Sequence, residues 1–155
     1  MMDWLVLAGF SFAAMAAAST GAIFAPGEWY RALNKPTWTP PDWVFPITWM
    51  VLYVAMVVAA WRVALSGDPL MAFALSIWSS QIVLNALWSP VFFGAQRVGA
   101  GMAVLVALWA SVAATLVTFL LVDLIAGLLF APYLVWVSIA GRLNWWILRN
   151  NPTGE

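Results

Sequence analysis

Three apolar stretches of the chain carry aromatic rings and amide or hydroxyl groups at helical spacing. Their polar and aromatic members recur every three or four residues, so on a helix each set shares one face. The three stripes are Phe45, Trp49 and Tyr53; Gln81, Asn85, Trp88 and Phe92; and Tyr133, Trp136, Ala140 and Asn144. Rings from several helices can stack on both faces of a planar guest. The stripes therefore predict a pocket for a flat apolar ligand, which Gln81 and Asn85 would orient.

Each of these residues also has a purely structural interpretation. Large aromatic side chains fill helix bundles, and buried amides hydrogen-bond between membrane helices for about 0.6–2 kcal/mol. For any single residue this interpretation stays open. The three stripes taken together favour the pocket.

The residue types that are absent narrow the chemistry. The chain has no histidine and no cysteine, so it lacks the usual general base, thiolate nucleophile, zinc ligands and strong haem ligands. Six acidic and six basic residues give a formal charge of zero, so the chain lacks the basic excess that binds nucleic acid. No acidic residue lies in the middle of an apolar stretch, so a proton relay has no support. We expect a binding protein that requires no metal and no cofactor of its own.

The elements that must position the stripes follow from hydropathy. The chain is 65% hydrophobic and 8% charged, and it contains twelve tryptophans, more than interfacial belts need. Five apolar runs approach or exceed the ~20 residues that cross a ~30 Å hydrocarbon core. They cover residues 4–24, 43–65, 70–93, 98–122 and 124–148. The sequence therefore predicts one all-α membrane domain over 1–155, a five-transmembrane-helix bundle with a first loop at 25–42 and a flexible tail at 150–155.

Polar residues and prolines mark the ends of these runs. Asp42, Asp68 and Asp123 are candidate N-caps, because each stands just before an apolar run. Gly94 is a candidate C-cap of the third run. Pro90 lies inside that run and predicts a kink.

Basic residues fall unevenly on the two sides of the predicted bundle. The side with the first loop, the third loop and the C-terminus carries five of the six, and the other side carries only Arg62. The five are Arg31, Lys35, Arg97, Arg142 and Arg149. The positive-inside rule then places the C-terminus in the cytoplasm if the chain sits in a plasma membrane, whereas an outer membrane would void the inference. Arg142 either snorkels towards headgroups or contacts a ligand carboxylate or a partner subunit.

Small residues at spacing four form ridges on three of the runs, which would let helices approach closely in lipid. The ridges are Ala13, Ala17 and Gly21; Ala72, Ser76 and Ser80; and Ala103, Ala107 and Ser111. Five helices need most of these ridges internally. We expect a homodimer that uses a remaining ridge, with the ridge of the third run as the candidate.

The first loop is unusually aromatic for a connection. It carries Trp29, Tyr30 and Trp38 together with the cations Arg31 and Lys35. Its rings could close a pocket as a lid while its cations meet a ligand carboxylate. Alternatively, its tryptophans lie at headgroup depth and its bases bind lipid phosphates. Both interpretations remain open.

Three ordered blocks resemble the translocator protein family, which comprises bacterial tryptophan-rich sensory proteins and mitochondrial peripheral-type benzodiazepine receptors. The blocks are WYRALNKPTWTPP at 29–41 leading into WMVLY at 49–53, QIVLNALWSPVFFG at 81–94, and PYLVW at 132–136 followed by Ala140 and Asn144. The resemblance covers the whole chain and suggests a bacterial member. It implies a five-helix bundle, commonly dimeric, with a pocket opening beneath the first loop.

The resemblance also implies a ligand class. The family binds porphyrins such as protoporphyrin IX, its mitochondrial members bind cholesterol and synthetic drugs, and members are linked to tetrapyrrole sensing, sequestration or transport. We therefore expect a porphyrin as the ligand of a binding protein, with a lipid or sterol as a further partner. The predicted ligand-binding residues are Trp29, Tyr30, Trp38, Trp49, Tyr53, Gln81, Asn85, Trp88, Phe92, Tyr133, Trp136, Ala140 and Asn144, and the predicted carboxylate contacts are Arg31 and Lys35.

Two other functions stay open. Some bacterial members are reported to degrade protoporphyrin in light with two tryptophans, which by motif are Trp49 and Trp136 here. A dimeric scaffold with an incidental pocket is the other alternative. The family's sterol segment survives only in part. Leu143 and Arg149 are in place, but between them tryptophan, at Trp145 and Trp146, replaces the expected tyrosine.

Overall fold

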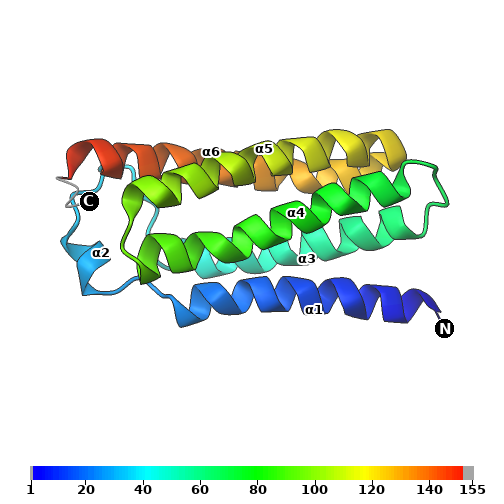
Figure 1. Cartoon of the computed structure of the whole chain (residues 1–155), viewed down its shortest axis with the longest axis horizontal. Coiled ribbons are helices and arrows are strands. Elements are labelled where there is room, and N and C mark those ends of the chain that lie inside the picture. Colours follow the sequence, from blue (N-terminus) through cyan, green and yellow to red (C-terminus); the bar gives the residue numbers. More distant parts are fainter. Residues whose placement is uncertain (1, 152–155) are drawn as a thin grey trace.

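Five long helices lie side by side and a short helix crosses one end of them in the computed structural model, which describes residues 2–151 (Figure 1). The elements are α1 Met2–Ile23, α2 Glu28–Ala32, α3 Val44–Ala64, α4 Met71–Ser89, the π-helical turn η1 Pro90–Gly94, α5 Val98–Val122 and α6 Leu124–Asn150. Five of these helices, with η1 continuing α4, are long and apolar enough to cross a membrane. The predicted all-α bundle of five spanning helices is confirmed.

The long helices close a ring whose order differs from their order in the chain. Helix α1 packs on α3 and α4, α6 packs on α3 and α5, and α4 packs on α5. The ring therefore runs α1, α3, α6, α5, α4. Figure 1 shows α2, the loop between α4 and α5 and the C-terminal end of α6 at one end of the bundle, with the start of α1 at the other.

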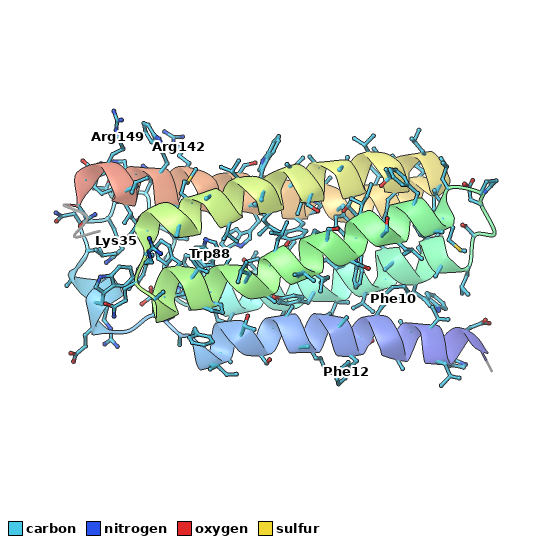
Figure 2. All side chains as sticks on the ribbon, in the orientation of Figure 1. Phe10, Phe12, Lys35, Trp88, Arg142 and Arg149 are labelled. Carbon is cyan, nitrogen blue, oxygen red and sulfur yellow. The ribbon has the colours of Figure 1, made fainter. Side chains whose placement is uncertain are left out.

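The side chains of the bundle point either into a packed core or out towards lipid. Phe10 of α1 packs edge-on against Trp78 of α4 with 5.0 Å between ring centroids, whereas Phe12 projects away from the bundle (Figure 2). Helices α5 and α6 approach closely at Gly127, where an added Cβ would clash with Leu120. An apolar outer face is stable because the surrounding solvent is hydrocarbon.

The small-residue ridges divide between the inside and the outside of the bundle. Ala17 of the first ridge is buried against the core. The ridge of α4 is exposed on the outer surface, where the Ser76 hydroxyl donates to Phe73 O and the Ser80 hydroxyl donates to Ser76 O. The α4 ridge is therefore available for contact with another molecule.

Of the predicted helix caps, the one at Asp123 is confirmed and the one at Asp42 is wrong. Asp123 caps α6 as predicted, since its Oδ1 accepts a 2.8 Å hydrogen bond from the Ala126 N–H. The prediction for Asp42 is wrong, because α3 begins at Val44 after Trp43 and no side chain caps it. An N-cap side chain accepts a hydrogen bond from an N–H of the first helical turn. The third residue of α3 is Pro46, which has no N–H to donate.

The other two predicted ends lie close to the observed ones but use different residues. Asp68 accepts a 2.7 Å hydrogen bond from the Leu70 N–H, and so it closes the turn before α4 instead of capping its first turn. Gly94 is the last residue of η1, and the positive φ of 57° that ends the segment belongs to Gln96. The predicted kink at Pro90 takes the form of η1, because the ring has no N–H for the regular helical bond.

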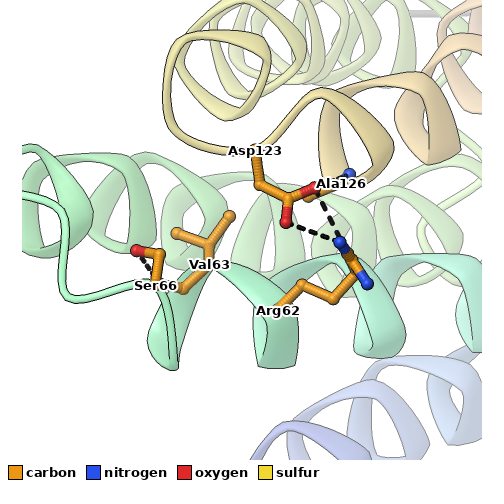
Figure 3. A network of polar contacts seen from close by, with 5 residues as sticks. All are labelled: Arg62, Val63, Ser66, Asp123 and Ala126. Atoms are coloured by element: carbon orange, nitrogen blue, oxygen red, sulfur yellow. Dashed lines mark hydrogen bonds and ion pairs between the residues drawn. The ribbon is translucent and has the colours of Figure 1, made fainter.

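Asp123 also makes the one ion pair among residues 2–151 (Figure 3). Arg62 of α3 donates from Nη2 to Oδ2 at 2.8 Å and from Nε to Oδ1 at 3.2 Å. The Arg62 hydrogen bond is the main reason that the pKa of Asp123 lies below its usual range. This contact ties α3 to the junction of α5 and α6 at the end of the bundle that carries few charges.

Replacing Asp123 tests how the cap and the ion pair share this stabilisation. Asp123→Asn removes the ion pair but keeps a capping oxygen, so we expect a loss of about 0.5–1 kcal/mol at pH 7, since both side chains are partly exposed. Asp123→Ala removes the cap as well and should cost about 1 kcal/mol more. Thermal unfolding in detergent measures both losses, with Arg97→Gln as a control outside any ion pair.

The pH dependence follows from the lowered pKa. The carboxylate's contribution is fully present above the pKa of an unfolded aspartate and is lost as pH falls through the folded value. The difference between the wild type and Asp123→Asn should therefore disappear in acid. An unchanged difference at low pH would contradict this account.

Candidate functional site

A cavity of about 610 Å³ opens at the end of the bundle that α2 crosses. Its lining consists of Gly21, Pro26, Tyr30, Arg31, Lys35 and Asp42 from α1, α2 and the first loop, Phe45 and Pro46 from α3, Trp88, Phe92 and Phe93 from α4 and η1, and Ala140, Leu143, Asn144 and Ile147 from α6. A volume of this size with a largely apolar lining is typical of small-molecule sites.

Aromatic rings form one wall of the cavity. Trp88 stacks on Phe92 with 4.9 Å between centroids and 17° between planes, and Phe93 meets Phe92 edge-on at 4.9 Å. Tyr30 of α2 packs edge-on against Phe93 at 5.3 Å. The wall thus joins α4, η1 and the first loop. It offers flat, rigid apolar surface to a guest.

Two polar atoms of lining residues are buried without a hydrogen-bond partner among the described residues. Asn144 donates from Nδ2 to Val98 O at 3.1 Å, and this bond leaves its Oδ1 unpaired. The indole Nε1 of Trp88 is also unpaired. A buried polar group without a partner costs about 1–3 kcal/mol. Two residues of the lining therefore each carry a buried, unpaired polar atom, one an acceptor and one a donor.

The two cations predicted to meet a carboxylate have different surroundings. Lys35 Nζ donates to the carbonyls of Tyr30 at 2.7 Å, Leu33 at 3.1 Å and Arg31 at 3.2 Å. These bonds use its three ammonium hydrogens and stabilise the C-terminal end of α2. Arg31 is exposed and lines the cavity. It is the lining cation whose donors can turn to a ligand, while Lys35 holds the loop (Figure 2 labels Lys35 and Trp88).

The phenol of Tyr30 remains neutral in this position. Burial raises the pKa of Tyr30 above its usual range, and the negative charge of Asp42 raises it further. Tyr30 therefore contributes an uncharged ring to the cavity, with Lys35 4.7 Å from the ring centroid.

A pair of asparagines fastens the first loop over this end of the bundle. The Asn34 N–H donates to Asn151 Oδ1 at 2.8 Å, and Asn151 Nδ2 donates to Asn34 O at 3.0 Å. We call this reciprocal pair the asparagine latch. The tail predicted at 150–155 thus begins with two ordered residues, since Asn150 ends α6 and Asn151 belongs to the latch, and 152–155 lie outside the described residues.

Four of the predicted ligand-binding residues form a deeper cluster that does not line the cavity. Tyr53 donates to Asn85 Oδ1 at 2.5 Å, and Asn85 Nδ2 donates to Tyr133 Oη at 2.8 Å. The ring of Trp49 lies 5.5 Å from that of Tyr53 and 6.0 Å from that of Tyr133. These bonds join α3, α4 and α6. The fully buried Gln81 likewise lies outside the lining, with Nε2 3.9 Å from the sulfur of Met56.

Three further predicted residues do not line the cavity, although two of them contact lining residues. Trp136 packs edge-on against Phe45 at 5.5 Å, and Trp29 packs edge-on against Phe92 at 5.8 Å. Trp38 is exposed beside Arg142. The structure therefore gathers these seven predicted residues around one space: Tyr30, Arg31, Lys35, Trp88, Phe92, Ala140 and Asn144.

Several lining residues were absent from the predicted ligand-binding set. Leu143 and Ile147 continue the spacing of Ala140 and Asn144 on α6, so an extension of that stripe towards the helix end would have found them. Phe93 follows Phe92 and reaches the cavity through the π-helical turn. No pattern in the sequence indicated Gly21, Pro26 or Asp42.

The asparagine latch should control how often the loop opens. Asn151→Ala removes two hydrogen bonds between the loop and α6, and each contributes about 1 kcal/mol. We expect amide hydrogen exchange over 28–38 to accelerate at least fivefold, since 1.4 kcal/mol corresponds to a factor of ten. Asn150→Ala is the matched control, because it keeps the backbone carbonyl that accepts from Asn34. Equal exchange in both variants would mean that the latch does not hold the loop.

Known proteins resemble the chain over nearly its full length. Residues 5–149 match the profile described as TspO/MBR family. "Protein CrtK" of Rhodobacter capsulatus is 46% identical over 153 residues, which cover 97% of this chain and 96% of the relative. "Tryptophan-rich sensory protein" of Cereibacter sphaeroides is 46% identical over 151 residues (97% and 94%). The human "Translocator protein" is 35% identical over 154 residues (96% and 91%). The match includes every helix that lines the cavity.

Proposed function

The chain belongs to the TspO/MBR family, and from this premise we propose that it binds a porphyrin-like molecule in the cavity beneath its first loop. The family and the five apolar helices make it an integral multi-pass membrane protein. The names of its relatives, a sensory protein and a translocator, support a role in sensing or transport, and we propose that the molecule sensed, sequestered or transported is a tetrapyrrole.

The observation that carries the proposal is the pairing of stacked rings with two unpaired polar atoms. A metal-free porphyrin is flat and apolar on both faces, has nitrogen donors and acceptors at its centre, and carries carboxylates on one edge. The rings of Trp88 and Phe92 can pack against the faces of the porphyrin. Asn144 Oδ1 can accept a hydrogen bond from a polar group of the ligand, and Trp88 Nε1 can donate one. Arg31 at the loop suits a carboxylate.

Filling the cavity should remove binding. In a dark titration of tryptophan fluorescence with protoporphyrin IX, we expect saturable quenching for the wild type. Ala140→Phe adds a ring to the lining and should weaken binding about tenfold or more, since overpacking a site costs typically 1–3 kcal/mol. Val54→Phe, on the exposed face of α3, is the matched control. Quenching that never saturates, or equal affinity in both variants, would indicate partition into the micelle.

The chain's ligand chemistry also predicts a preference between porphyrins. Without histidine or cysteine, an iron would have only tyrosine or methionine as protein ligands, and the one such residue of the lining, Tyr30, is a neutral phenol packed against Phe93. We expect metal-free protoporphyrin to bind at least as tightly as haem in parallel titrations. Much tighter haem binding with the spectrum of a protein-ligated iron would contradict this.

A second candidate function is light-dependent porphyrin degradation, favoured by the aromatic contacts behind the cavity. Trp136 touches the lining residue Phe45, and Trp49 touches Tyr53 and Tyr133. If these indoles supply electrons, exchanging Trp49 and Trp136 together for phenylalanine should abolish coloured products under illumination while most binding persists. Products that form at the wild-type rate in the double variant would remove this candidate.

Orientation and assembly are part of the same proposal. The end of the bundle with α2, Arg97 and Arg149 carries the basic excess, which supports a cytoplasmic C-terminus if the protein sits in a bacterial plasma membrane. The exposed α4 ridge supports a homodimer. If the protein acts only as a dimeric scaffold, Ala140→Phe would leave both the dimer and the cellular phenotype intact.

A further inference from the structure

A second, smaller hollow of about 230 Å³ lies on the outer surface between α5 and α6. We call it the outer groove. Its walls include Met102, Val106 and Trp109 of α5 and Ser138, Gly141 and Arg142 of α6. Gly141 gives the groove depth, since a Cβ there would lie 3.8 Å from Leu105 Cδ2 and a larger side chain would fill the space.

The two ends of the outer groove differ in chemistry. Towards the middle of the bundle, Trp109 Nε1 donates to Ser138 Oγ at 2.8 Å, which satisfies both groups and leaves an apolar surface. Arg142 lies at the other end. It follows Ser138 by four residues, which is about 6 Å along α6 at a rise of 1.5 Å per residue. The groove therefore offers an apolar channel that ends at a cation.

Arg142 has an unusual position for a charge. It lies about 12 Å before the last residue of α6, on the outer face of a membrane-spanning helix. Its guanidinium lies over the Trp38 ring, 5.1 Å from the centroid, which leaves the N–H groups in its plane free to donate. The ion pair of the described residues belongs to Arg62 and Asp123, so no carboxylate within 2–151 neutralises it.

A second cation, Arg149, lies on the same side of α6 as Arg142. Arg149 follows Arg142 by seven residues and lies over the ring of the exposed Trp145, 5.1 Å from its centroid. Figure 2 shows both arginines projecting from α6 away from the bundle. A negative partner would stabilise charges on a membrane-spanning helix, because hydrocarbon solvates them poorly.

We propose that the outer groove binds a phospholipid with a net negative headgroup. The phosphate accepts hydrogen bonds from Arg142, the headgroup lies towards Arg149, and one acyl chain follows the groove past Gly141 to the bond between Trp109 and Ser138. Arginine suits this role because its planar donors match phosphate geometry. The assignment is independent of the porphyrin cavity, since the two hollows share no lining residue.

Two other occupants fit the groove less well. A neutral sterol would leave both guanidinium groups without a negative partner. In a two-fold interface, a second copy of the chain would place its own outer groove against this one. Among residues 2–151 that face carries arginines and no acidic residue, so the two copies would bring like charges together. Charge complementarity thus favours an anionic lipid.

Native mass spectrometry of the detergent-solubilised protein with equal phosphatidylglycerol and phosphatidylcholine of matched chains tests the proposal. We expect the wild type to retain phosphatidylglycerol preferentially. Arg142→Gln should reduce that retention about fivefold, since a basic residue near an anionic headgroup contributes roughly 1 kcal/mol. Arg97→Gln, an exposed cation at the same end of the bundle and outside the groove, should change it little.

A groove-filling variant separates the channel from the charge. Gly141→Leu should reduce retention of phosphatidylglycerol although both arginines remain. Gly9→Leu is its matched control, since a side chain at Gly9 meets nothing within 4 Å. Equal retention of the two lipids by the wild type, or equal loss in Arg142→Gln and Arg97→Gln, would overturn the proposal. So would a Gly141→Leu variant that loses dimers while keeping its lipid, because the groove would then be an interface between copies.

Discussion

Hydrocarbon offers no hydrogen bonds, so each polar group inside this bundle depends on a partner that the chain itself supplies. Several serines and threonines of the spanning helices meet this demand by donating to carbonyls of their own helices, as Ser76 and Ser80 do. Asn85 meets it by accepting from Tyr53 and donating to Tyr133, and these bonds hold three helices in register. Asn144 and Trp88 meet it only in part. Gln81 Oε1 and Trp78 Nε1 are unpaired as well, but neither residue lines the cavity, so only Asn144 and Trp88 carry such an atom at a place that can receive a ligand.

The same constraint explains where the charges lie. Arg62 is neutralised by Asp123 at one end of the bundle. At the other end, Lys35 is satisfied by three carbonyls of the first loop. Arg31 and Arg142 keep donors that the described residues do not use, one at the cavity beneath the first loop and one at the outer groove. Both hollows therefore combine apolar walls with a cation, which is the arrangement that an amphipathic anion requires.

Composition and local pattern were enough to predict the fold, because a spanning helix is determined by its own length and hydropathy. The cap at Asp123 could be predicted for the same reason, since it involves only the next three residues. Helical spacing identified the faces of the stripes but not their depth. Asn85 and Asn144 have similar patterns, yet one lies in the closed cluster and the other at the cavity. The asparagine latch joins residues 117 positions apart, and no local signal could indicate it.

We propose that the unpaired polar atoms of the lining residues become the ligand's hydrogen-bond partners. The indole ¹H–¹⁵N signals of the labelled protein test it most directly, because Trp88 and Trp78 both have a buried Nε1 without a partner among the described residues, and Trp78 lies outside the cavity lining. We expect saturating protoporphyrin IX in the dark to move the Trp88 proton downfield, as a new hydrogen bond forms, and to leave Trp78 unchanged. An unmoved Trp88 signal at saturation, or equal shifts of both signals, would contradict the account.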